Sequence, residues 1–189
     1  MGFDVNLRLF ETASDACLAL VSQKTADVAL VAGRPDPALF TSKFLFNPEL
    51  ALCVPANHPF ATRDKQLSYA DLKDIPQFLP PDLNYSFQAT NNACLAKGFE
   101  PLYAETDYSN ESQIDSIAAG RGVAFMPENF ECALADQRVR LVHMRKDEAC
   151  RIPLWLTWLK TANLTPDIEA FIDYLEGLFA MEDNHSKSR

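Results

Sequence analysis

The chain lacks the features that several large classes of protein require. Its 189 residues carry 17 Lys and Arg against 26 Asp and Glu, a formal net charge of −9. Phosphate binding needs a basic face, so this balance argues against a chain that holds DNA or RNA by itself. No apolar run approaches the roughly 20 residues of a membrane-spanning helix. The first residues show no signal-peptide pattern, and we expect a cytoplasmic protein without a membrane partner.

Motifs for metal binding and catalysis are also missing. The five cysteines and three histidines are scattered, and no two cysteines have the C-x-x-C spacing. We therefore predict no metal site and no cofactor, with the cysteines as small core residues of a reducing compartment. The sequence contains no Gly-x-Ser-x-Gly elbow, no glycine loop for phosphate and no His-Glu-x-x-His. We predict that the chain is not an enzyme.

The clearest positive signal is a pair of apolar runs that each stop at proline. Residues 50–54 are typical of a strand buried on both faces, and Pro55 and Pro59 keep the chain extended after it. Residues 122–127 form a second such run. We interpret both as crossings between two lobes with a cleft between them. This predicts an α/β fold with lobe I at 1–54 and 129–180, lobe II at 55–128, and a polar tail at 181–189.

Periodicity and capping signals place the other elements. Residues 3–10 alternate between apolar and polar positions, which predicts a half-buried strand, and residues 15–23 predict a helix with Ser14 as its N-cap. The apolar run 28–32 predicts a strand parallel to the first, as in a β-α-β unit. Further strands are expected at 42–46, 76–79, 102–106, 139–143 and 152–159, and further helices at 69–73, 86–97, 111–119, 129–135 and 167–180.

Several short motifs follow one another over nearly the whole chain, short of the polar tail. They are Ala26-Asp27-Val28-Ala29-Leu30-Val31, Leu50-Ala-Leu-Cys-Val-Pro55 with Asn57-His58-Pro59, Leu67-Ser-Tyr-Ala-Asp-Leu72, and Ala118-Ala-Gly-Arg-Gly-Val-Ala-Phe-Met-Pro127. Their order and spacing resemble the effector-binding domain of LysR-type transcriptional regulators. The resemblance implies two Rossmann-like lobes joined by two crossover strands, like type 2 periplasmic binding proteins. It also implies a small-molecule effector in the cleft that modulates DNA binding by a winged helix-turn-helix absent from this sequence.

The same resemblance implies that the first strand and first helix of the effector domain are absent too. In the family that strand lies between the counterparts of residues 5–9 and 28–32, so its loss leaves backbone groups unpaired or forces new pairing. We expect a truncated form or gene fragment that is less stable than a complete domain, or completed by another chain. Because the family pairs its domains antiparallel, we expect a homodimer or tetramer formed through residues 5–9 and 111–119.

Ligands of open α/β sheets bind outside the carboxyl ends of the strands, so helix starts and the two crossings are the candidate effector contacts. Ser14, which follows Ala13, is either a contact for a carboxylate or phosphate or a plain N-cap. It also matches the position where the family commonly presents Ser or Thr to effectors. Arg34 is either a bidentate partner for an effector carboxylate or a solvated turn residue.

The candidates in the second lobe share a place at a helix start or in the second crossing. For each, capping, loop structure or core packing is the alternative explanation. Asp82 would repel an anionic ligand, which favours a neutral or amine-bearing effector or a side chain turned away. The candidates are Asp82, Asn84, Tyr85, Tyr108, Ser109, Asn110, Phe125 and Met126.

Two other functions stay open beside the effector-binding domain. A solute-binding protein for transport has the same fold, although five thiols and the lack of a signal-peptide pattern weigh against it. A prephenate dehydratase-like enzyme on this fold needs an acid or hydroxyl positioned in the cleft, and the sequence does not identify one.

Overall fold

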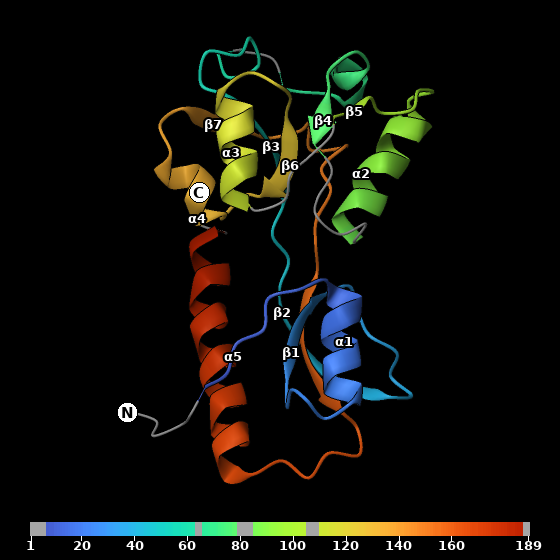
Figure 1. Cartoon of the computed structure of the whole chain (residues 1–189), viewed down its shortest axis with the longest axis vertical. Coiled ribbons are helices and arrows are strands. Elements are labelled where there is room, and N and C mark those ends of the chain that lie inside the picture. Colours follow the sequence, from blue (N-terminus) through green and yellow to red (C-terminus); the bar gives the residue numbers. More distant parts are fainter. Residues whose placement is uncertain (1–6, 63–65, 79–84, 105–109, 187–189) are drawn as a thin grey trace. The chain divides into compact units, whose positions relative to one another are not determined.

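The computed structural model describes residues 7–62, 66–78, 85–104 and 110–186, and the chain divides into two units (Figure 1). The first unit is Met1–Asn47 with Pro153–Arg189, and the second is Pro48–Ile152. The sequence-based boundaries assign residues 48–54 and 129–152 to the first lobe, whereas the structure groups them with the second. Strand pairing is the reason, because β3 (Leu50–Pro55) takes β6 (Ala124–Pro127) and β7 (Val139–Val142) as its neighbours.

The first unit is a three-stranded antiparallel sheet with a helix packed on each face. Its strands are β1 (Ala29–Ala32), β2 (Phe40–Phe46) and β8 (Leu154–Leu159), in the order β1-β8-β2. Helix α1 (Ser14–Ser22) packs with Trp155 and Leu159, and α5 (Pro166–Ser186) packs with Leu156 and Trp158. Since alternate residues of a strand point to opposite faces, β8 supplies the core on both sides.

Three expectations for this unit are wrong. Residues 7–10 form no strand, and Leu7 and Leu9 are 66% and 83% exposed. An alternating pattern becomes a strand only where a neighbouring strand supplies hydrogen bonds. β1 therefore has no parallel partner there and pairs antiparallel with β8. The last helix also continues to Ser186, six residues into the expected polar tail, because a helix propagates through backbone bonds without needing an apolar face.

The second unit is built around β3, all six residues of which are buried, as the sequence predicts. Beside its sheet lies a short parallel pair, β4 (Gln77–Phe78) and β5 (Tyr103–Ala104). One side of β3 packs with Cys94 and Tyr69, and the other with Ile114 and Ile117. Its helices are η1 (Tyr69–Leu72), α2 (Tyr85–Ala96), α3 (Asn110–Ala118) and α4 (Glu131–Ala135).

Backbone contacts hold β4 on both sides. The Gln77 N–H donates to Leu102 O at 2.8 Å, and the Phe78 N–H donates to Val123 O at 2.8 Å. The Cβ of any other residue at Gly122 would lie 2.8 Å from the Pro76 carbonyl oxygen, so glycine permits this close approach. The direction in which the Gln77 side chain leaves the strand is therefore fixed.

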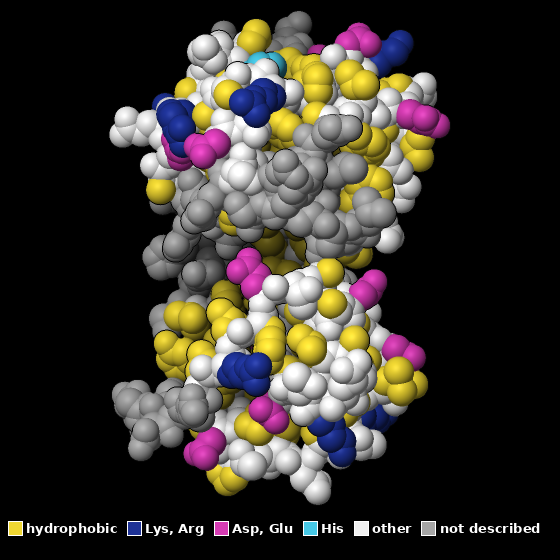
Figure 2. Space-filling view, viewed as in Figure 1, with side chains coloured by type: hydrophobic (Ala, Val, Ile, Leu, Met, Phe, Trp, Pro, Cys, Tyr) yellow, Lys and Arg dark blue, Asp and Glu magenta, His cyan; other side chains and the backbone are white. Residues whose placement is uncertain are grey.

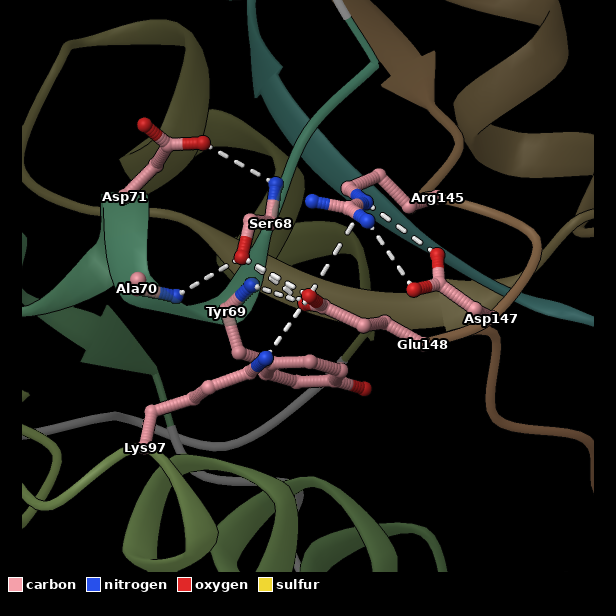
Figure 3. A network of polar contacts seen from close by, with 8 residues as sticks. All are labelled: Ser68, Tyr69, Ala70, Asp71, Lys97, Arg145, Asp147 and Glu148. Atoms are coloured by element: carbon pink, nitrogen blue, oxygen red, sulfur yellow. Dashed lines mark hydrogen bonds and ion pairs between the residues drawn. The ribbon is translucent and has the colours of Figure 1, made fainter.

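A buried carboxylate ties η1 to two distant segments (Figure 3). Glu148, whose side chain is 9% exposed, accepts hydrogen bonds from the Ser68 hydroxyl at 2.9 Å and the Tyr69 N–H at 2.8 Å. The Lys97 ammonium lies 2.8 Å from the same carboxylate. Burial works to raise the pKa of Glu148, but these three donors outweigh it and hold that pKa below its usual value. Ser68 also caps η1, as the sequence predicts.

Candidate functional site

The start of α1 presents hydrogen-bond donors that the helix itself does not use. The Cys17 N–H is bonded to Ala13 O at 2.8 Å, so the N–H groups of the three residues before it precede the helical ladder. The N-cap is Ala13, which makes no side-chain cap. The sequence predicts Ser14 as the N-cap, but Ser14 is the first helical residue. Its hydroxyl oxygen instead accepts the Ala32 N–H at 3.1 Å, at the end of β1.

This hydrogen bond determines what the Ser14 hydroxyl can offer a ligand. A hydroxyl has one hydrogen to donate and two lone pairs to accept with, and the Ala32 N–H occupies one lone pair. Within the described residues, no acceptor takes the hydrogen. Ser14 is thus a donor for an oxygen acceptor, while the exposed Asp15 on the same turn complements the positive end of the helix dipole.

A stacked guanidinium lies two residues beyond Ala32. The Arg34 Cζ is 5.3 Å from the centre of the Trp155 ring, and the Phe44 ring meets the same indole edge-on at 5.5 Å. Gly33, at φ 78°, turns the chain between β1 and Arg34. Among the described residues no carboxylate pairs with Arg34, which leaves its planar set of N–H donors for solvent or a ligand.

A pocket in the second unit is formed by α2, the β4–β5 pair and β6. Its cavity volume is about 20 Å³, and it opens to solvent. Gln77, which is 5% exposed, belongs to its lining, and the side-chain Nε2 of this residue has no hydrogen-bond partner. The lining residues are Gln77, Phe78, Ser86, Phe87, Thr90, Tyr103 and Phe125.

The structure brings together only some of the predicted site residues. Ala13, Ser14 and Arg34 lie at the carboxyl end of β1, as the hydrogen bond to Ala32 requires. Phe125 lines the pocket of the second unit and stacks on Tyr69 at 5.4 Å.

The remaining predicted residues lie elsewhere. Tyr85 begins α2, 41% exposed, and does not line the pocket. Met126 is 4% exposed and belongs to the core with Ile114. The others fall outside the described residues, wholly or, for the first residue of α3, as a side chain: Asp82, Asn84, Tyr108, Ser109 and Asn110.

Sequence reasoning missed the two aromatic rings beside Arg34 and the glutamine of the pocket. Phe44 and Trp155 look like ordinary strand residues, because only the register of β8 places them in contact. Gln77 has a signal in the sequence, since it is the polar residue of the short strand predicted at 76–79. A buried polar side chain in a strand that has neighbours on both sides needs a hydrogen-bond partner.

The described residues contain no group of three or more His, Cys, Asp and Glu side chains that could hold a metal ion. None of their helices combines the length and apolar character needed to span a membrane.

The sequence pattern of the LysR substrate binding domain family matches residues 3–180, nearly the whole chain. The chain belongs to this family. This LysR domain is similar in structure to the effector binding domain of a BenM variant, with a TM-score of 0.77 and 19% identity over 95% of this chain and 83% of that one. At these identities the likeness shows the fold, and it confirms the predicted α/β fold of the periplasmic-binding-protein type.

Two further LysR neighbours extend the comparison. The effector binding domain of QuiR, determined in complex with shikimate, gives a TM-score of 0.77 and 17% identity over 91% of this chain and 80% of that one. A cysteine mutant of Corynebacterium glutamicum OxyR gives a TM-score of 0.76 and 18% identity over 94% of this chain. The present LysR chain covers 55% of the OxyR chain. No curated protein matches the sequence.

Proposed function

We propose that this chain is a regulatory domain that binds a small-molecule effector and catalyses no reaction itself. The observation that carries the proposal is the LysR family match over residues 3–180. The effector modulates DNA binding by a part of the protein outside this sequence, since a chain of net charge −9 is unsuited to phosphate contacts. The binding of shikimate by QuiR supports a small-molecule ligand.

The donors of the first unit favour an effector that carries a carboxylate or another oxygen acceptor. The start of α1 offers backbone N–H groups, Ser14 offers a hydroxyl hydrogen, and Arg34 offers a guanidinium that can bind a carboxylate bidentately. Trp155 and Phe44 restrict where that guanidinium lies, which lowers the entropic cost of binding.

A thermal-shift screen tests this proposal with amino acids, aromatic acids, sugar acids and nucleobases as ligands. A compound that binds only the folded chain stabilises it by about 2.7 kcal/mol at a concentration 100 times its Kd. We expect Ser14→Ala to abolish the shift. Ser22→Ala makes the same change at the other end of α1, where the hydroxyl donates to Leu18 O, and should keep the shift. Equal shifts in both variants would contradict a site at Ser14.

We further propose that the domain self-associates into a homodimer or tetramer through residues 5–9 and α3. The exposed Leu7 and Leu9 support this. In sedimentation equilibrium, Leu9→Asp should lower the associated fraction, whereas Leu134→Asp, at a leucine of α4 that is 62% exposed, should leave it unchanged. A monomer at every concentration would contradict the proposal.

The cytoplasm is the compartment that we propose for this protein. None of the described cysteines, Cys17, Cys53, Cys94 and Cys150, forms a disulfide. Burial raises the pKa of Cys53 to about 12 and that of Cys94 to about 11, which makes both unreactive as nucleophiles. The rival functions are transport and a prephenate dehydratase-like reaction; turnover of prephenate by the purified chain would overturn the regulatory proposal.

A further inference from the structure

The side chain of Gln77 is an exception in the core of the second unit. Four polar side chains in the described residues are buried: Gln77, Thr90, Gln113 and Thr157. The Thr90 hydroxyl donates to backbone carbonyls of α2, and the Thr157 hydroxyl bonds to Ser42 and to Thr41 O. Gln77 is the one of these four with a side-chain polar atom, Nε2, that has no hydrogen-bond partner.

The backbone at Gln77 is held in place. Its N–H bonds to Leu102 O, the next residue bonds to Val123 O, and the strand is thereby held on both edges. Burial raises the pKa of the neighbouring Cys94 thiol to about 11, and the Gln77 amide offsets part of that rise. The two groups nonetheless do not reach hydrogen-bond geometry, so the Nε2 hydrogens stay unused within the described residues.

The pocket around this amide combines aromatic walls with further polar groups, among them the Thr90 hydroxyl. Phe87, Tyr103 and Phe125 contribute aromatic rings, and the rings of Phe87 and Tyr103 lie 5.6 Å apart at 45°. The Thr90 hydroxyl gives its hydrogen to Ser86 O at 3.0 Å, which leaves the lone pairs of the oxygen to accept. The cavity volume of about 20 Å³ suits one small group and not a whole ligand.

We propose that this pocket is a subsite for a hydroxyl group carried on an aromatic or other flat apolar ring. The hydroxyl oxygen accepts from Gln77 Nε2, its hydrogen is donated to Thr90 Oγ1, and the ring lies among the aromatic side chains. A carboxylate is disfavoured, because no Lys or Arg is among the lining residues and a buried charge without a partner is costly. This subsite does not rest on the proposed function.

The two units then differ in the ligand chemistry that they favour. The donors at Ser14 and Arg34 suit an anionic oxygen, and the pocket at Gln77 suits a neutral hydroxyl.

NMR titration of the full chain with four probes tests the subsite, with the Gln77 side-chain NH₂ signals as the readout. The probes are phenol, benzyl alcohol, toluene and benzoate at millimolar concentrations. We expect the two hydroxyl compounds to shift these signals saturably, and toluene and benzoate to have little effect. Signals unmoved by every probe would mean that water alone fills the pocket. Equal shifts with toluene would mean an apolar cavity without hydroxyl recognition, and either result overturns the subsite.

Variants then assign the effect to the amide. Gln77→Leu should weaken phenol binding by about fivefold, the loss of roughly one hydrogen bond. Gln113→Leu makes the same change in α3, outside the pocket, and should leave phenol binding unchanged. Equal losses in both would overturn the assignment to Gln77. If Gln77→Leu does not fold, the titration of the natural chain still decides.

The outcomes separate this inference from the proposed function. Gln77 signals that no hydroxyl probe moves, found together with a Ser14-dependent effector, would disprove the subsite and leave effector binding intact. In the opposite outcome, phenol binds saturably at Gln77 while no compound raises the midpoint of unfolding in a Ser14-dependent way. That result would support the subsite and contradict effector binding at Ser14.

Discussion

β3 in the second unit has a strand on each side, whereas β1 in the first unit pairs only with β8 among the described residues. Every residue of β3 is buried, but Leu30 in β1 is 45% exposed. The Ala32 N–H bonds to Ser14 and the Gly33 N–H to Pro153 O, so alternation directs the Leu30 backbone to the open edge. β3 is thus the central strand of its sheet, whereas β1 is an edge strand of the other.

Apolar residues in both units form clusters on the two faces of a central strand, β3 in the second unit and β8 in the first. Of these two strands, only β3 is buried along its whole length. Leu7, Leu9 and Leu30 of the first unit stay at the surface. Figure 2 shows hydrophobic side chains reaching the surface in patches between scattered charged ones. We therefore expect the second unit to provide more of the stability and the first unit to provide the surface that another segment or chain can cover.

The largest effect should come from shortening a side chain in the core of the second unit. Leu52→Ala, in the middle of β3, should lower the free energy of unfolding by about 3 kcal/mol, because it removes buried methyl groups and leaves a cavity. Leu30→Ala at the open edge should cost less than about 1 kcal/mol. Urea denaturation of both variants measures this. Similar losses of stability in the two variants would mean that Leu30 is packed as tightly as Leu52.

Glu148→Gln should come next, with a loss of about 2 kcal/mol at pH 7, because the donors around this buried carboxylate lose their charged partner. The folded-state pKa lies below the usual 4.5, so this stabilisation is fully present above about pH 4.5 and disappears as the pH falls through the folded-state pKa. Urea unfolding between pH 7 and 3 should show this dependence in the natural chain and less of it in the variant.

The matched control for Glu148 is Asp147→Asn. Asp147 is the exposed partner of Arg145 in the same turn, and its side chain is 67% exposed. Exposed pairs contribute little, so the control should keep both the stability and the acid dependence. Acid dependence lost equally in both variants would show that Glu148 is not its source.

Gln77→Leu should have a smaller effect of opposite sign. Replacing an unpaired buried amide with an apolar side chain of similar size should raise the free energy of unfolding by about 1 kcal/mol without ligand. A residue that lowers stability but binds a ligand fits the known trade-off between stability and function. Thermal and urea unfolding would measure the gain, and a clear loss would show that the native core satisfies this amide.

The smallest difference should appear between neighbours in β1. The Val31 N–H points toward β8 and the Leu30 N–H toward the open edge, so Leu30 should exchange its amide hydrogen roughly tenfold faster. Leu52 and Cys53, which have strands on both sides, should both exchange slowly. Hydrogen exchange followed by NMR tests this, and a protected Leu30 would show that the edge is covered in solution.

Local patterns alone predicted much of the second unit. The apolar run of β3 predicts its burial, Ser68 predicts the start of η1, and Gly98, which has φ 83°, predicts the end of α2. Each of these signals depends on residues that are close in sequence, so no distant partner has to be known.

The candidate site was less accessible to prediction. Ser14 and Arg34 could be named because both stand at an element boundary. The use of the Ser14 hydroxyl depends on Ala32, however, and the position of the Arg34 guanidinium depends on Trp155. Gln77 could be seen as polar in an apolar strand, but its unpaired state depends on segments from three parts of the chain.

The sequence by itself determined the family, the α/β class and the position of most helices and strands, because these follow from short-range periodicity, capping and turn residues. Only the tertiary structure decided that residues 7–10 form no strand, that β1 runs antiparallel to β8, and that the donors at Ser14 and Gln77 stay available. The physical reason is that strand pairing and hydrogen-bond satisfaction are set by neighbours far away in sequence.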